Sequence, residues 1–181
     1  MRHHDQVTSA PLPPVEFAAP LGGPRRFTTT TPTPIGELLL LGDGESITGL
    51  YMLPDHLYMP SIADDWVRDP GLFGELERQL DAYFAGELKV FDVPLAPRGT
   101  PFQLDVWREL STVPCGVTTT YGAMALAIGK PTASRAVGAA NGRNPISIIL
   151  PCHRVVGANG SLTGYGGGLP RKMRLLDMER G

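Results

Sequence analysis

The pentapeptide Pro151-Cys152-His153-Arg154-Val155 carries the most information in this chain of 181 residues. It follows the apolar run Ile146-Ser147-Ile148-Ile149-Leu150, which predicts a buried strand, and it precedes a glycine-rich stretch that ends in Tyr165-Gly166-Gly167-Gly168. A thiol beside an imidazole at the end of a buried strand suits a nucleophilic cysteine, because thiolate is the attacking species and a nearby imidazole lowers the thiol pKa. A lone cysteine is more often a small buried hydrophobe, so the surrounding sequence has to decide between the two interpretations.

Composition places the chain among globular proteins, with one sizeable domain or two small ones. It is 42% hydrophobic and 19% charged, and no apolar run approaches the roughly 20 residues of a membrane span. Residues 1–24 are rich in proline and alanine, lack the layout of a signal peptide and are predicted to be disordered. The two cysteines are therefore expected to be free thiols in a reducing, cytoplasmic compartment.

Charge is divided unevenly between the two halves of the chain. Residues 1–94 hold 6 basic and 14 acidic side chains, whereas residues 95–181 hold 10 basic and 4 acidic ones. Residues 131–174 contain six basic residues and no acidic one. A positive half on a mildly acidic protein is typical of a polyanion-binding protein, although a solvated basic surface would give the same counts. Charge alone favours neither a polyanion-binding protein nor a solvated basic surface.

The first half predicts an antiparallel sheet followed by one helix. In residues 26–53, β-branched and apolar stretches are separated by the turn signals Pro34-Ile35-Gly36 and Asp43-Gly44, which is the pattern of hairpins. Residues 70–87 repeat apolar side chains at steps of three and four, which predicts an amphipathic helix. Residues 92–99 contain two prolines and predict a linker to the second half.

The second half predicts three short helices in succession. Thr100-Pro101 is an N-cap followed by proline at the first helical position, and Pro114-Cys115-Gly116 closes this first helix. Residues 121–128 and 133–141 predict the next two helices, separated by a turn that contains glycine and proline. This order is the outline of a helix-turn-helix, although many small helical domains contain such pairs.

The third of these helices consists almost entirely of small residues, which let another backbone approach closely. Glycine inside a helix costs roughly 1 kcal/mol relative to alanine, so its presence calls for a reason. One reason is a packed protein core, and the other is a helix that lies in a DNA groove. Helices of this kind are more often core, but the long charged side chain of Arg135 at the helix start fits a core poorly.

Taken together, these motifs closely resemble the O6-alkylguanine-DNA alkyltransferases, also called methylated-DNA–protein-cysteine methyltransferases. The resemblance rests on Asn144-Pro145, the pentapeptide 151–155, the glycines after Tyr165 and a helix over residues 170–180 with a glutamate, and it covers residues 26–181. It implies a DNA repair protein that moves an alkyl group from O6 of guanine in double-stranded DNA to its own cysteine, irreversibly and once per molecule. It also implies a monomer without a cofactor, and it leaves open whether monomers cluster on DNA.

The resemblance assigns chemical roles to five residues. Cys152 stands at the alkyl acceptor, His153 at the base that takes the thiol proton through a bridging water, and Glu179 at the carboxylate that orients this histidine, as in a triad. Tyr121 stands where a hydroxyl donates to the guanine ring, and Asn144 where a hinge ties the recognition helix to the cysteine segment. Without the resemblance, the position of Glu179 near the end of the chain favours an exposed side chain. The resemblance reverses that expectation and implies a carboxylate inside the site.

Seven further residues are expected to bind DNA or the extruded base. The alkyl carbon is out of reach inside a duplex, so the nucleotide has to be flipped out at a cost of roughly a few kcal/mol. Arg135 is expected to fill the vacated place in the stack, while the helix of small residues enters the minor groove. The carbonyl group of Val155 is expected to meet the guanine amine. The complete set is Arg135, Ala136, Gly138, Val155, Tyr165, Gly166 and Gly167.

Two residues depart from the family pattern. Gly166 stands where some relatives have serine, so one hydroxyl contact to the base is absent. Cys115 lies outside the motif and is expected to be structural. The first half contains no cysteine–histidine cluster with metal-ligand spacing, so no metal site is expected.

The predicted fold class is α+β: a disordered tail (1–24), a small N-terminal sheet-plus-helix domain (25–93) and a mostly helical C-terminal domain (94–181) with the helix-turn-helix, a short strand pair and the cysteine. Three other functions compete with alkyl transfer: a non-catalytic binder that marks alkylated bases for another repair pathway, a cysteine hydrolase, and a DNA-binding regulator. Cys152 argues against the binder, and adjacent cysteine and histidine rarely form a hydrolase pair.

Overall fold

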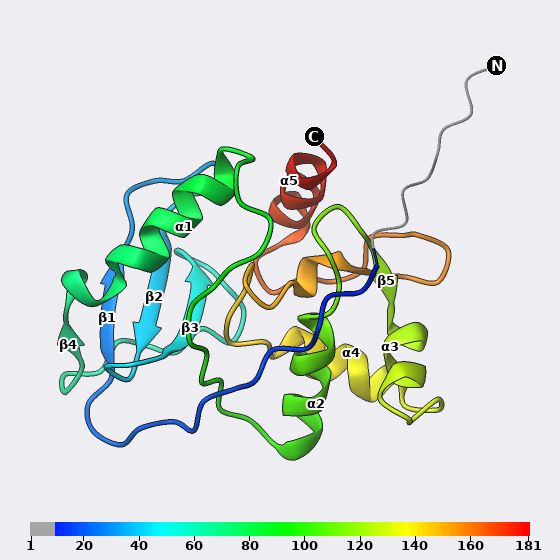
Figure 1. Cartoon of the computed structure of the whole chain (residues 1–181), viewed down its shortest axis with the longest axis horizontal. Helices are drawn as coiled ribbons and strands as arrows, with labels where there is room; N and C mark the ends of the chain where they lie inside the picture. The colour runs from blue at the N-terminus through cyan, green and yellow to red at the C-terminus, as the bar shows by residue number, and fades with distance from the viewer. Residues whose placement is uncertain (1–9) are drawn as a thin grey trace.

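The computed structural model describes residues 10–181 and has an α+β architecture (Figure 1). A four-stranded sheet with one long helix laid across it forms the N-terminal half of the molecule. Helices and short strands form the C-terminal half, in which the last helix returns beside the sheet domain. The predicted fold class is confirmed.

The sheet has the strand order β3-β2-β1-β4. β1 (Arg26–Thr29), β2 (Leu38–Gly42) and β3 (Ile47–Met52) form the antiparallel meander that the turn signals predict. β4 (Val67–Arg68) pairs in parallel with β1 at the edge. Its two exposed residues lie in a stretch without a strand pattern, so the sequence does not predict it.

β2 is the centre of the first half, because both of its faces are buried. One face belongs to the main core, which also contains buried side chains of the 3-10 helix η1 (Pro70–Phe73) and of helix α1 (Gly74–Phe84). The other face packs in a smaller cluster around Tyr51. Alternate leucines of the strand serve the two faces: Leu38 and Leu40 the first, Leu39 and Leu41 the second.

The three helices predicted in the second half are all present. α2 (Pro101–Leu110) begins with a capping box, in which the Thr100 hydroxyl accepts from the Gln103 backbone and the Gln103 side chain accepts from the Thr100 backbone. It ends before the turn that was expected to close it. α3 (Tyr121–Ala127) and α4 (Ser134–Gly142) follow with a short turn between them, which gives the helix-turn-helix.

A single buried tryptophan fixes α4 against α2. The Trp107 ring is almost fully buried, and its Nε1 donates to the Ala140 carbonyl oxygen at 2.8 Å. The bond satisfies the polar group of a large core side chain, as buried indoles require. As a result, one side of α4 faces the core, and its remaining small residues stay on the surface.

The predicted strand over residues 146–150 is wrong. This segment is a series of turns, with one isolated bridge between Ile146 and Leu50 of β3 and a positive φ of 71° at Ile148. Cys152 begins a short 3-10 helix, η2 (Cys152–Arg154), and not the end of a strand. An apolar run can equally be a buried turn when its backbone groups find other partners.

The strand pair of the second half lies on either side of the cysteine segment in the sequence. β5 (Thr119–Thr120) and β6 (Val155–Val156) pair in parallel. This pairing places the residues before α3 beside Val155, the last residue of the pentapeptide. The final helix, α5 (Leu169–Arg180), packs against η2. Within residues 10–181, no helix combines the length and the apolar character that a membrane crossing needs.

Residues 10–24 do not behave as the predicted disordered tail. They run in an extended path across the front of the molecule (Figure 1), and the Leu12 and Ala18 amides donate to the Thr112 and Leu95 carbonyl oxygens at 2.9 and 2.8 Å. Val15 and Phe17 pack against the main core, which includes residues of both halves. Residues 1–9 of the predicted tail lie outside the described part of the chain.

Candidate active site and DNA-binding groove

Asn144 shapes the turn that presents the cysteine. Its side-chain oxygen accepts from the Ile146 amide at 3.0 Å, and its side-chain nitrogen donates to the Leu150 carbonyl oxygen at 2.7 Å. The Cys152 amide also donates to this carbonyl, at 2.8 Å. Asn144 is buried and links the end of α4 to the cysteine segment, so its position fits the predicted hinge.

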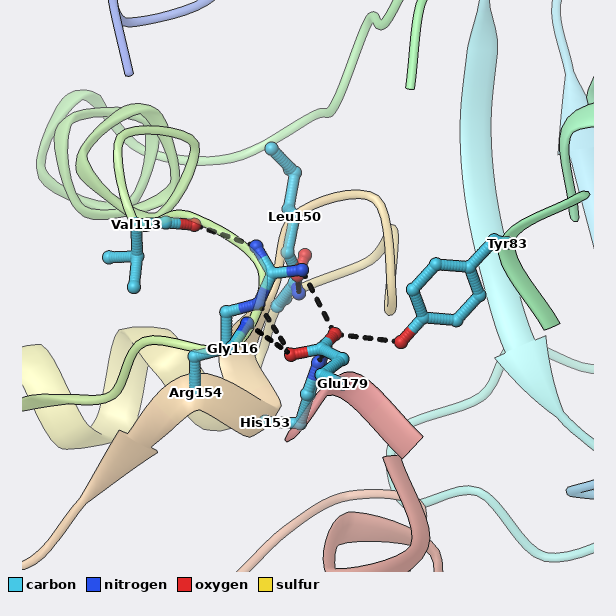
Figure 2. Close-up of polar contacts among 8 residues, drawn as sticks. Tyr83, Val113, Gly116, Leu150, His153, Arg154 and Glu179 are labelled. Atoms are coloured by element: carbon cyan, nitrogen blue, oxygen red, sulfur yellow. Dashed lines mark hydrogen bonds and ion pairs between the residues drawn. The ribbon is translucent and has the colours of Figure 1, made fainter. Parts of the chain in front are cut away.

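Glu179 is the centre of a buried polar network (Figure 2). Its side chain is 2% exposed. Oε1 lies 2.6 Å from His153 Nε2 and accepts from the Tyr83 hydroxyl at 2.7 Å. Arg154 donates to both carboxylate oxygens at 2.9 Å and, through its third nitrogen, to the Val113 carbonyl oxygen. The structure therefore brings His153 and Glu179 together from sequence positions 26 residues apart.

The network fixes the tautomer of His153. Although burial raises the pKa of Glu179, hydrogen bonds from His153 and Arg154 hold it well below its ordinary value, so the carboxylate is ionised and can only accept. His153 Nε2 must therefore carry the hydrogen. Burial lowers the pKa of His153 despite the adjacent carboxylate, so the ring is neutral and Nδ1 has a free lone pair. Nδ1 is buried and has no hydrogen-bond partner within the described residues.

The Cys152 thiol is buried, and its environment pulls its pKa in two directions. Burial raises the pKa, while the side chains of Asn144 and Ser147 and the Lys172 ammonium lower it. The net direction is upward, so the resting group is a thiol and not a thiolate. A thiol of this kind needs a base before it can attack, and the adjacent His153 has an unoccupied basic nitrogen.

A surface groove of about 780 Å³ runs along α4 beside this site. The polar side chains that it contains include three tyrosines and one arginine. Five predicted site residues line it: Tyr121, Ala136, Gly138, Tyr165 and Gly166. Cys152 does not line the groove. Burial and, after it, the nearby Cys152 thiol raise the pKa of the Tyr165 hydroxyl, so this groove residue lies close to the thiol.

The remaining predicted residues occupy distinct places around this groove. Tyr121 forms a hydrogen bond with the Thr163 hydroxyl, with the two oxygens 2.6 Å apart. The Val155 carbonyl oxygen, expected to meet guanine, accepts from the buried Lys172 ammonium at 2.7 Å. Gly167 is buried against Met52, whose sulfur would overlap a Cβ at this position. The loop 164–167 is therefore packed tightly on the sheet domain at Gly167.

Only half of the basic residues in the acid-free stretch 131–174 are free to meet an external anion. Three are engaged in internal hydrogen bonds: Arg154, Arg171 and Lys172. The other three are exposed and form no ion pair with the described residues: Arg135, Arg143 and Arg174. The first two lie at the start and just after the end of α4, next to the groove.

Comparison with known proteins agrees with this geometry. Residues 27–97 match the model of the 6-O-methylguanine DNA methyltransferase ribonuclease-like domain, and residues 101–181 match that of the DNA-binding domain of the same proteins. The methylated-DNA–protein-cysteine methyltransferase of Mycobacterium tuberculosis is 56% identical over 151 residues, which cover 83% of this chain and 90% of that protein. The chain belongs to the 6-O-methylguanine DNA methyltransferase family.

Other members of the 6-O-methylguanine DNA methyltransferase family support the same assignment. The methylated-DNA–protein-cysteine methyltransferase of Methanosarcina acetivorans is 54% identical over 147 residues, 81% of this chain and 94% of that protein. Among solved structures, that of Mycobacterium tuberculosis OGT in complex with DNA matches with a TM-score of 0.82 and 54% identity, over 86% of this chain and 93% of that chain. The family predicted from the sequence is confirmed.

Four side chains of the site were not predicted. Arg154 and Tyr83 donate hydrogen bonds to Glu179. The Asn141 side-chain amide donates to the Cys152 carbonyl oxygen at 3.4 Å, and the Lys172 ammonium donates to the Val155 carbonyl oxygen of β6. Arg154 offered a signal, because a charged residue inside an apolar pentapeptide needs a buried partner. Tyr83 and Lys172 offered none, since each fits an ordinary amphipathic helix. In the described residues, no three histidine, cysteine or acidic side chains gather in a way that could hold a metal ion.

Proposed function

We propose that this chain repairs DNA by taking the alkyl group of O6-alkylguanine onto Sγ of Cys152, irreversibly and once per molecule. Membership of the family supports DNA repair by methyl transfer, with DNA as the partner. The observation that carries the finer proposal is the pairing of His153 Nε2 with an ionised Glu179 at 2.6 Å. This pairing leaves Nδ1 as an unoccupied base in the residue next to the buried thiol.

The proposed step transfers one alkyl group to sulfur and, in net, one proton from the thiol to guanine. A water carries the thiol proton to Nδ1 of His153, and the resulting imidazolium is stabilised by Glu179. The thiolate attacks the alkyl carbon, the new C–S bond forms, and the bond between that carbon and O6 breaks. Its electron pair stays on guanine, and the Tyr121 hydroxyl supplies a proton to the ring. The proton held by His153 then returns through water to Tyr121, so both side chains end in their starting protonation states. Thioether and guanine are the products, and no step of this proposal returns the thiol, so each molecule acts once.

Access to the thiol requires the damaged nucleotide to leave the duplex. α4 presents small residues along the groove, so a DNA backbone can approach this helix closely. We propose that Arg135, exposed in the first turn of α4, enters the space that the nucleotide leaves. The extruded base then meets the loop 164–167 and the Val155 carbonyl group, with the alkyl group directed past Tyr165 to the sulfur.

The test is intact mass and peptide mapping after incubation with a duplex that contains O6-methylguanine. One added methyl on the Cys152 peptide is expected in wild type and none in Cys152→Ala, which is expected to keep its affinity for the duplex. An unmodified wild type that still binds the lesion would favour the competing function, a binder that marks alkylated bases. Equal loss of transfer and binding in Cys152→Ala would contradict the role given to this residue.

Arg135 offers a separate test of nucleotide flipping. Arg135→Ala is expected to slow the repair of duplex DNA by about tenfold or more, because an unfilled stack lets the base return before it reacts. Alkylation by a free O6-alkylguanine base needs no flipping and is expected to be unchanged. The measurement is the rate of Cys152 alkylation with each substrate. An equal decrease in both rates would show that Arg135 acts on the pocket and not on the duplex.

The domain division near residue 94, the monomeric state and the cytoplasmic location belong to the same proposal. The matched regions, 27–97 and 101–181, support a division close to the predicted linker. The two free cysteines, Cys115 and Cys152, fit a reducing compartment. Size measurements in solution and on DNA would test the monomer and its clustering.

A further inference from the structure

The sheet domain contributes one loop to the groove beside α4. This loop, residues 54–59, follows β3, and two of its side chains, Leu57 and Tyr58, line the groove opposite the small residues of the helix. Both are unusually exposed for apolar residues, at 57% and 54%. Adjacent exposed apolar side chains in a groove are typical of a binding surface.

Tyr58 is held in an unfavourable backbone conformation. Its φ is +61°, in the left-handed region that a tyrosine rarely adopts. Such conformations persist where surrounding contacts over-determine them, and they cluster at functional sites. The adjacent Leu57 amide provides one such contact, since it donates to the Gly166 carbonyl oxygen at 2.8 Å. The loop is thereby tied to the segment proposed to receive the extruded base.

Arg143 covers one face of the Tyr58 ring. Its guanidinium carbon lies 3.7 Å from the ring centroid, and the residue follows the last residue of α4. Arg143 lines the groove and forms no ion pair with any residue in the described part of the chain. Tyr58 as a whole is still 54% exposed with this contact in place, so a flat group could pack against its ring. Stacking on tyrosine orients the guanidinium and leaves its N–H groups free.

We propose that Tyr58 and Arg143 bind the DNA strand that carries the lesion, next to the extruded nucleotide. The Tyr58 ring packs against an unstacked base or its sugar, and Arg143 donates to a phosphate of the same strand. The inference rests on the proposed function, because it takes DNA as the occupant of the groove. It adds a contact from the sheet domain, so the DNA is held between the two halves of the protein.

The continuity of the groove supports DNA over other partners. The same groove contains Ala136 and Gly138, where a backbone can approach, and Tyr165, whose hydroxyl lies close to the thiol. The exposed arginines of the acid-free stretch include one at each end of α4. An unstacked nucleotide offers both chemistries that the pair can recognise, a flat apolar ring and an anionic oxygen.

The experiment measures duplex affinity in a Cys152→Ala background, where no alkylation disturbs the equilibrium. Tyr58→Ala is expected to weaken binding of an O6-methylguanine duplex about tenfold, whereas Tyr58→Phe, which keeps the ring, stays within about twofold of the parent. Arg143→Ala is expected to weaken binding and to reduce the salt slope by about one. Arg68→Ala and Met173→Ala are the controls, since each removes an exposed side chain outside the groove.

A second readout separates DNA contact from damage to the pocket. With Cys152 present, Tyr58→Ala and Arg143→Ala are expected to react with a free O6-alkylguanine base at the parent rate. Unchanged duplex affinity in both variants, or an equal loss with the free base, would overturn the proposal. Failure of the wild type to alkylate Cys152 from a lesion duplex would instead overturn the proposed function, so the two failures are distinguishable.

Discussion

The burial and the partners of Glu179 cannot be predicted from its local sequence. Its place in the last turn of α5 suggests an exposed carboxylate, yet its side chain is 2% exposed and accepts hydrogen bonds from three other side chains. No local pattern encodes this, because His153 and Arg154 reach it from 25 residues away or more. Only the family resemblance predicted that the carboxylate serves His153.

Removing the charge at this position should damage both chemistry and stability. Glu179→Gln cannot hold the imidazolium of His153, so Cys152 alkylation is expected to slow by roughly 100-fold at neutral pH. The rate is expected to recover in part as pH rises and the thiol ionises without help. The buried Arg154 loses its ionic partner, so the free energy of unfolding is expected to fall by about 3 kcal/mol. Single-turnover rates across pH and urea unfolding measure the two effects.

Tyr83→Phe is the matched control for Glu179→Gln. It removes the hydrogen bond, 2.7 Å long, that an uncharged hydroxyl donates to the same carboxylate, and it leaves the charge of the carboxylate in place. A stability loss of about 1.5 kcal/mol with an unchanged pH profile is expected. A shifted pH profile in Tyr83→Phe, or an unshifted one in Glu179→Gln, would contradict the orienting role of the charge.

Among the elements, the cysteine segment was the hardest to predict. Periodicity cannot distinguish a buried strand from a buried turn when every residue is apolar. Two features that periodicity does not report make this segment a turn. The Asn144 side chain accepts a hydrogen bond within the turn, and Ile148 adopts a positive φ. The capped helices α2 and α3 were predictable, because their start signals, Thr100 and Thr120, act within three residues.

The packing of the loop 164–167 leaves room only for glycine at position 166. A Cβ there would lie 2.8 Å from His56 Nε2. His56 cannot move away easily, because its Nδ1 accepts from the Met52 amide at 2.9 Å and its ring packs edge-on against Tyr51. The glycine and the histidine therefore form a matched pair across the two halves of the protein.

Gly166→Ser should reveal this match. The substitution is expected to lower the free energy of unfolding by about 2 kcal/mol and to slow alkylation, because the serine overpacks the loop against His56. Gly164→Ser is the control for stability, since no atom lies within 4 Å of a Cβ at that position. In a double-mutant cycle, Gly166→Ser with His56→Ala is expected to cost less than the sum of the two single changes. Strict additivity would show that the two residues do not compete for space.

At the scale of the whole molecule, the uneven division of charge was predictable from the sequence. Which of the basic side chains remain free to bind an anion was not. The acid-free stretch indicates a basic surface, yet Arg154, Arg171 and Lys172 turn inward to satisfy carbonyl and carboxylate oxygens. A count of charges cannot separate structural cations from those available to DNA. The α+β division and the helix-turn-helix were predictable, because turn signals and helical periodicity are local.

The extended segment over residues 10–24 joins the two halves, which composition did not indicate. The Val15 amide donates to the Ser111 hydroxyl at 3.0 Å, and the Arg108 guanidinium lies 5.2 Å from the centre of the Phe17 ring. At its other end, the Leu21 amide donates to the Asp43 carboxylate of the sheet domain at 3.0 Å, and the Leu21 carbonyl oxygen accepts from Arg98 at 3.1 Å. Proline-rich segments form few internal hydrogen bonds, so their order depends on docking of this kind.

Replacing the two apolar anchors of this segment tests its contribution. Val15→Ser with Phe17→Ser is expected to lower the free energy of unfolding by about 2 kcal/mol, because each half-buried side chain loses part of its transfer free energy. The melting temperature should fall by about 5 °C for a protein of this size. Glu16→Ala, an exposed neighbour in the same segment, is the control and should leave it unchanged. One cooperative transition is expected to remain, since the main core contains residues of both halves; two separate transitions would show that the segment alone couples them.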